Sequence, residues 1–353
     1  MKSNISIRNY FVFICLCFVA LGVVPANALS LGEGVALPVQ GTFNRAVWSP
    51  DGSGIALAGE RYKGLYYADL FGNLFTISDK PLAGWKFRWS PDGQGLVYRV
   101  RDDEESTTLA LMCSKRGEEG SKQLTPWLND LFPPTVGEDG ITYRSGDELI
   151  TVDEDGNVIK VHSLSQGRGV LSRVMSVAAS LMLGRLTGAT YTGFACALAS
   201  QAAAGKPSKG VYLDSESQIW VVDENGNRRK LIDVEDEPGY CAPEQSPDGS
   251  KYAVEGFSGN LYVTDARGGE PINLGEGHNP SWSPDGRYVI FEVTTDDGHV
   301  ITSSDLWVAS ADGSERIQLT NTPGIEGSPT WSPDGNYIAY IVDGQVYIAP
   351  VEP

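Results

Sequence analysis

The chain contains 353 residues, of which 45 are Asp or Glu and 27 are Lys or Arg, so its formal net charge is −18. Phosphate groups repel so acidic a protein, and the composition therefore argues against nucleic acid or an anionic lipid surface as the partner. A chain of this length can bury a full hydrophobic core.

Residues 1–28 have the pattern of a secretory signal peptide. Lys2 and Arg8 precede an apolar run over residues 10–24, and Ala26-Asn27-Ala28 gives the small-x-small pattern that signal peptidases cleave. We expect cleavage after Ala28, a periplasmic or secreted mature protein, and no membrane span in what remains. An uncleaved membrane anchor is the alternative.

The mature chain would keep three cysteines, Cys113, Cys196 and Cys241. An odd number of cysteines allows at most one internal disulfide in an oxidising compartment. We therefore expect the fold to be stabilised by its core rather than by disulfides.

From Phe43 onward a five-residue turn phrase recurs along the chain. Its four complete copies are Trp48-Ser49-Pro50-Asp51-Gly52, Trp89-Ser90-Pro91-Asp92-Gly93, Trp282-Ser283-Pro284-Asp285-Gly286 and Trp331-Ser332-Pro333-Asp334-Gly335. A fifth copy over 245–249 lacks only the Trp, and a sixth over 136–140 keeps the frame. Ser opens a type I turn, Pro presets φ, Asp bonds the turn amides and Gly accepts a positive φ. Each copy therefore predicts a turn between two antiparallel strands, with the Trp filling space between packed sheets.

Each repeat has a second half, in which an apolar strand leads into another turn. These strands start at residues 65, 109, 149, 219, 261, 306 and 346, at intervals of 44, 40, 70, 42, 45 and 40 residues. Four short antiparallel strands in about 42 residues are the size of one propeller blade. The spacing predicts an all-β protein, a β-propeller of seven four-stranded blades, with six or eight blades as alternatives.

The phrases resemble the repeat of the TolB-like β-propeller family, a WD40-like repeat with this Trp-Ser-Pro-Asp-Gly turn. The resemblance covers the chain from Phe43 to its end and implies a single propeller domain over 29–353. TolB itself carries an additional domain ahead of its propeller, for which we expect no room here.

The final repeat ends in its third strand, over 346–349, without a fourth. We expect the N-terminal segment 34–40 to pair outside that strand and close the ring, which would also protect a sheet edge. Pro38 suits such an edge position because its missing N–H can face solvent.

The interval of 70 residues indicates a degenerate blade with an insertion around 163–232. The excess falls at 171–205, where the turn phrases vanish and some apolar residues follow helical spacing. An eighth blade, or a contact with a partner or membrane, are the alternatives for this segment.

Catalytic templates find little support in the sequence. The chain has no Gly-x-Ser-x-Gly elbow, no phosphate-binding glycine loop, and only His162, His278 and His299 as histidines. We expect no catalytic residues, no metal ligands and no cofactor. A Ca²⁺ site in the acidic loops 102–105 or 296–297 is the alternative to solvated loops, but no EF-hand spacing supports it.

In propellers, the loops that vary between blades are the place to look for binding residues. With the usual strand order, the two kinds of turn share one face of the disc, and the loops entering the first strands share the other. Residues at these entries that we expect near the mouth of the central channel are Arg45, Lys86, Arg88, Glu244, His278, Asn279 and Glu326.

These observations predict an exported, non-catalytic propeller that binds an envelope or extracellular protein or peptide, as a monomer. A hydrolase or lyase acting on saccharide or peptide at the channel mouth, with Ca²⁺ as a possible requirement, is the alternative. The scarcity of His and the missing nucleophile motif favour binding.

Overall fold

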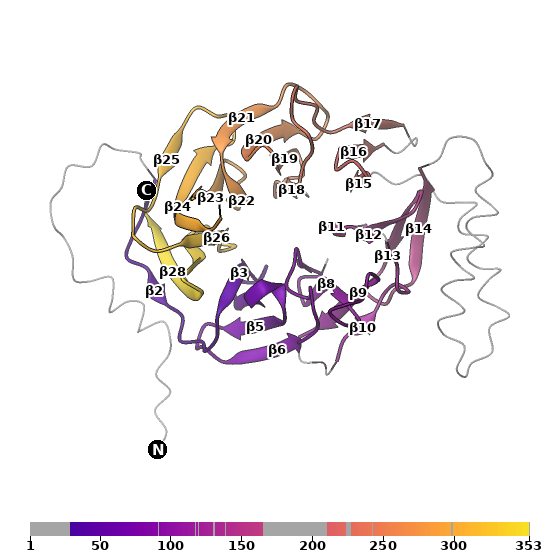
Figure 1. The fold of residues 1–353 in the computed structure, drawn as a ribbon, viewed down its shortest axis with the longest axis horizontal. Helices are drawn as coiled ribbons and strands as arrows, with labels where there is room; N and C mark the ends of the chain where they lie inside the picture. Colours follow the sequence, from indigo (N-terminus) through magenta and orange to yellow (C-terminus); the bar gives the residue numbers. More distant parts are fainter. Residues whose placement is uncertain are drawn as a thin grey trace, which may run out of the picture.

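The computed structural model describes residues 29–90, 92–116, 118, 120–129, 131–137, 139–164, 210–223, 227–241, 243–297 and 299–352. These residues form seven antiparallel sheets that are arranged as blades of a ring (Figure 1). In six blades the earliest strand lies toward the centre and the last at the rim, whereas the N-terminal strands lie at the rim of the seventh blade. The fold is therefore the seven-bladed all-β propeller that the sequence predicts. In the part of the chain so described, no helix has the length and apolar character needed to span a membrane.

The blades follow one another in chain order. Blade 1 contains β3 (Phe43–Trp48), β4 (Gly54–Gly59), β5 (Leu65–Asp69) and β6 (Leu74–Ser78), with the 3-10 turn η1 (Glu60–Tyr62) after β4. Blade 2 contains β7 (Arg88–Trp89), β8 (Gly95–Arg101), β9 (Leu109–Lys115) and β10 (Lys122–Gln123). Blade 3 contains β11 (Thr135–Gly137), β12 (Gly140–Ser145), β13 (Glu148–Val152) and β14 (Val158–Ser163). Blade 4 contains β15 (Gly210–Leu213), β16 (Ile219–Val222) and β17 (Arg228–Lys230). Blade 5 contains β18 (Glu244–Gln245), β19 (Lys251–Glu255), β20 (Asn260–Asp265) and β21 (Ile272–Glu276). Blade 6 contains β22 (His278–Trp282), β23 (Tyr288–Asp296), β24 (Ile301–Ser310) and β25 (Arg316–Gln318). Blade 7 contains β26 (Glu326–Trp331), β27 (Tyr337–Val342), β28 (Gln345–Glu352) and the N-terminal strands β1 (Ser30–Leu31) and β2 (Val35–Ala36).

The N-terminal segment closes the ring by completing blade 7. Val35 of β2 pairs with Ile348 of β28, and the N–H of Leu37 donates to the carbonyl of Val346 at 2.8 Å. The predicted pairing is thus confirmed. β1 adds a pairing that the sequence did not indicate, because Leu31 lies opposite Val351.

The hallmark turns form the same hydrogen bonds in all five Ser-Pro-Asp-Gly copies. The Ser Oγ donates to the Asp Oδ1 at 2.5–2.7 Å and accepts the N–H five residues after it at 2.9–3.1 Å. The Gly that ends each turn has φ between 68° and 75°. A Cβ added to Gly52 of blade 1 would lie 3.8 Å from Cδ of Pro333 in blade 7, so the turns also touch across the closure. The structural role that the sequence predicts for these Asp residues is what the geometry shows.

Among the described residues, the hydrophobic core is divided into seven buried clusters, one at each contact between neighbouring blades. The hallmark Trp residues lie in these clusters with 7–9% of their surface exposed, each against the preceding blade. The cluster between blades 3 and 4 is small, with Leu149, Leu164, Tyr212 and Val222 buried. Seven clusters for seven blades make a closed ring, since an open arc would leave one contact missing.

Two expectations concern residues outside those that the structure describes. The signal peptide over 1–28 is one, and the insertion at 171–205 within the degenerate blade is the other. Cys113 and Cys241 both carry free thiols.

Candidate functional site

The seven candidate residues come from the innermost part of five blades. Arg45 lies on β3, Arg88 on β7 with Lys86 just before it, Glu244 on β18, His278 and Asn279 on β22, and Glu326 on β26. The structure brings six of them into one polar cluster around the centre of the ring. Glu326 is separate: it is 3% exposed, and its Oε1 accepts a hydrogen bond from Thr322 Oγ1 at 2.9 Å.

An ion pair crosses the centre of the ring. Arg88 Nη2 of blade 2 lies 2.7 Å from Glu244 Oε1 of blade 5, and each side chain is 20% exposed. Blades 2 and 5 are not neighbours in a ring of seven, so this pair links opposite walls of the channel. Charges from different blades are therefore close enough here to act on a single ligand.

Two glutamates that the sequence analysis missed hold the other half of the cluster. Glu255, at the end of β19, lies 2.9 Å from His278 Nδ1 and also accepts the N–H of Asn279 at 3.3 Å. Glu292, on β23, accepts from Asn279 Nδ2 at 2.9 Å and from the N–H of Ser328 at 2.5 Å. Each glutamate thus connects its own blade to the next one.

A signal for these glutamates was present in the repeat. Glu255 and Glu292 stand ten residues after Gln245 and Trp282, at the same place in blades 5 and 6. The same place holds Ala58, Arg99 and Ile341 in blades 1, 2 and 7. Only an alignment of the blades at positions outside the turns would have identified the two glutamates.

The backbone that presents this cluster is strained in a repeated way. The residue three positions before the hallmark Trp is left-handed in three blades, with φ of 52° at Lys86, 50° at Asn279 and 50° at Ser328. Non-glycine residues rarely adopt this region, and holding one there costs roughly 1–3 kcal/mol. In blades 6 and 7 the N–H turned inward by this conformation is the one that a glutamate of the preceding blade accepts.

Burial and neighbouring charges shift the acidities of the cluster. Desolvation and the nearby Arg88 lower the pKa of Arg45, while desolvation and Arg45 lower the pKa of Lys86. Desolvation also raises the pKa of Glu292. Blades 1 and 2 therefore present cations that are poorly solvated and repel one another.

The hydrogen bond between His278 and Glu255 favours the charged form of both residues. The hydrogen bond with Glu255 raises the pKa of His278. Burial acts to raise the pKa of Glu255, but the bond with His278 and the charge of Lys86 bring it below its usual value. The two residues therefore form a mutually stabilised ion pair when His278 is protonated.

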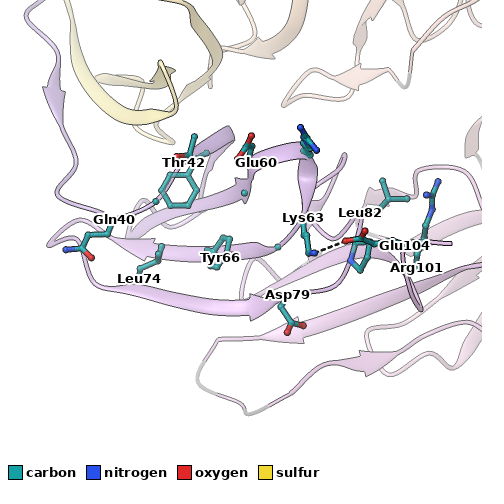
Figure 2. Close-up of a pocket in the computed structure, with 16 residues that line it drawn as sticks. Gln40, Thr42, Glu60, Lys63, Tyr66, Leu74, Asp79, Leu82, Arg101 and Glu104 are labelled. Atoms are coloured by element: carbon teal, nitrogen blue, oxygen red, sulfur yellow. Dashed lines mark hydrogen bonds and ion pairs between the residues drawn. The ribbon is translucent and has the colours of Figure 1, made fainter. Parts of the chain in front are cut away.

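A pocket of about 890 Å³ lies on blades 1 and 2, between the connections that enter β3 and β7 (Figure 2). Lys63 and Glu104 form an ion pair of 2.7 Å at the pocket, and both are well exposed, so it stabilises little. The η1 turn separates pocket from channel, because Arg61 lines the pocket while Tyr62 interacts electrostatically with Arg45. A ligand on this face could contact both.

The geometry offers no support for a nucleophilic mechanism at the cluster. Burial raises the pKa of the Cys241 thiol, which lies beside Glu255, to about 11, so it is protonated and a poor nucleophile near neutral pH. Among the described residues, no group of three or more His, Cys, Asp or Glu is placed to hold a metal ion. In the acidic loops, Asp103 and Asp297 accept main-chain N–H groups of their own loops, as turn residues do.

Residues 207–352 match the family model of the TolB beta propeller domain, PD40. The repeats of blades 4 to 7 are thus similar to those of the TolB family. The match covers blades 4 to 7 as far as they are described, and the complete hallmark turns of blades 1 and 2 have the same hydrogen bonds. None of the curated proteins matches the chain. The propeller repeat thus accounts for the fold, and the polar cluster is built from positions that the repeated turns do not use.

Proposed function

We propose that this TolB-type propeller is an exported, non-catalytic protein that binds an envelope or extracellular protein or peptide. Binding takes place on the face of the disc where the first strands begin, with the channel mouth and the adjoining pocket as the contact surface. The seven candidate residues, from Arg45 to Glu326, belong to this face. Export rests on the signal-peptide pattern of residues 1–28.

One observation carries the proposal. The polar residues that differ between blades meet at the centre of the ring, whereas the Asp residues of the opposite face are occupied by the same turn hydrogen bonds in blade after blade. A rigid scaffold that presents variable side chains at one place is what a binding function needs. The chemistry of Cys241 and His278 described above gives no reason to prefer a hydrolase or lyase.

Site-specific photo-crosslinking in the exporting cell tests the proposal. A photoreactive residue at Glu60, which is exposed on the pocket side, is expected to crosslink to one defined envelope or secreted protein or peptide. A photoreactive residue at Ser314, which is exposed in a turn of the opposite face, serves as the matched control. Crosslinking of the same partner from both faces with equal yield, or of no partner from Glu60, would contradict the proposal.

A further inference from the structure

Two cations of the channel have no carboxylate within ion-pair distance among the described residues, although the Arg45 guanidinium lies 5.5 Å from the centre of the Phe87 ring. The Nε atom of Arg45 is buried and has no hydrogen-bond partner among the described residues. No ion pair or hydrogen bond of the Lys86 side chain is found in the same part of the chain. Burying a polar donor without an acceptor costs free energy, so each of these groups would gain from an anion.

The carboxylates around them are already engaged. Glu244 is paired with Arg88 at 2.7 Å, and Glu255 with His278 at 2.9 Å. Glu292 accepts from two N–H donors, at 2.5 and 2.9 Å. The charge of Glu244 in blade 5, on the other side of the ring, acts on both Arg45 and Lys86. Both cations therefore face the channel rather than the bulk solvent at the rim.

We propose that Arg45 and Lys86 bind a carboxylate group of the ligand at the channel mouth. An arginine presents parallel N–H donors that match the two oxygens of a carboxylate, and a lysine adds a point charge. A doubly charged phosphate would meet stronger repulsion from Glu244 and Glu255, so the singly charged group is the better fit.

The backbone conformation of Lys86 supports a binding role for this residue. Lys86 has a φ of 52°, which costs a lysine free energy that an Asn or Gly would largely avoid. Desolvation and the charge of Arg45 act against the same side chain, since they lower its pKa. Lys86 therefore contributes little to the stability of the unliganded protein, whereas its charge would stabilise a bound carboxylate. The identity of the ligand as a peptide or protein rests on the proposed function, but the carboxylate site itself does not.

Binding of a matched pair of small probes tests the site on the full-length protein. N-acetylglycylglycine carries a free carboxylate, and its amide, N-acetylglycylglycinamide, has the same shape without the charge. Calorimetric titration and thermal melting in chloride buffer of constant ionic strength are expected to show binding of the acid and a raised Tm. The amide is expected to bind more weakly than the acid by roughly tenfold or more. Equal effects of acid and amide would overturn the proposal without any variant being needed.

Variants then assign the site to the two cations. Lys86→Met and Arg45→Met are each expected to weaken binding of the acid by roughly tenfold or more, while Lys86→Arg retains most of it. Lys160→Met, which removes a half-buried lysine from the outer strand of blade 3, is the control and should bind as the wild type does. An equal loss in Lys160→Met, or tighter binding of inorganic phosphate than of the acid by the wild type, would overturn the assignment.

The outcome can be separated from that of the crosslinking experiment. Binding of the acid that depends on Lys86, together with no partner crosslinked from Glu60, would keep the carboxylate site and refute the proposed function. A partner crosslinked from Glu60, together with no preference for the acid, would refute the carboxylate site alone.

Discussion

Closure of the ring by its N-terminal segment can be tested at a single side chain. Leu37 is 6% exposed and packs with Phe43 and Val346 between blades 1 and 7. Replacing Leu37 by Ala keeps the main-chain hydrogen bond from Leu37 to Val346 but removes the packed side chain. Such a buried Leu→Ala change is expected to lower the free energy of unfolding by about 2–5 kcal/mol.

The matched control lies two residues earlier in the same segment. Val35 is 58% exposed although its backbone pairs with Ile348, so Val35→Ala should change the free energy of unfolding by no more than about 0.5 kcal/mol. Equilibrium unfolding in urea, followed by tryptophan fluorescence and by circular dichroism, measures both variants against the wild type. If Leu37→Ala were as stable as Val35→Ala, the segment would not be part of the closed core and the reasoning would be refuted.

Three further predictions concern the channel, its pH dependence and the turns. Lys86→Asn is expected to raise the free energy of unfolding by about 1 kcal/mol, because Asn tolerates a φ of 52° and the mutual repulsion with Arg45 is lost; urea unfolding that shows a decrease would contradict this. The pKa of His278 is raised in the folded protein, so its stabilising effect is present below its unfolded pKa and is lost as the pH rises through the folded value. The stability difference between wild type and His278→Gln, from urea unfolding at several pH values, should therefore shrink from pH 6 toward pH 8. Burial lowers the pKa of His162, so the wild type should gain stability relative to His162→Gln as the pH rises from 5 to 7. If the stability differences of the two variants changed with pH in the same direction, these pKa shifts would be refuted. Gly286→Ala should cost about 1–2 kcal/mol in urea unfolding because φ there is 69°, whereas Gly137→Ala, whose Cβ would meet nothing within 4 Å, should be nearly neutral; equal costs would mean that turn geometry is not the cause.

The fold could be predicted because the turns repeat their chemistry. Each Ser-Pro-Asp-Gly phrase needs its own Ser, Asp and Gly for local hydrogen bonds, so the phrase survives in five copies and gives the blade spacing directly. The pairing of β1 was missed for the opposite reason. Ser30 and Leu31 are too short a strand to have any periodicity, and only the free edge of β28 gives them a partner.

The candidate site could be predicted only in part. Residues at the starts of the first strands were correctly expected to lie together, since six of the seven candidate residues form one cluster. Which of them bind a ligand stays a prediction. Glu255 and Glu292 were missed because they lie in second strands, where their sequence context is that of an ordinary apolar strand. Their partners, such as Ser328, belong to the next blade, and a contact between blades leaves no local pattern in the sequence.

The differences between blades at the channel follow from what the ring leaves unconstrained. Turn positions are fixed by local hydrogen bonds and core positions by contacts between blades, so neither can vary freely. The positions of Lys86 and Glu255 satisfy neither requirement: the first is strained, and the second is a carboxylate at a place where blades 1 and 7 use Ala58 and Ile341. The strained cation Lys86 at the centre of an otherwise regular ring weakens the fold locally. Such departures from the repeat are expected where a protein binds something. For the same reason, the single substitution Lys86→Asn should both stabilise the fold and weaken carboxylate binding.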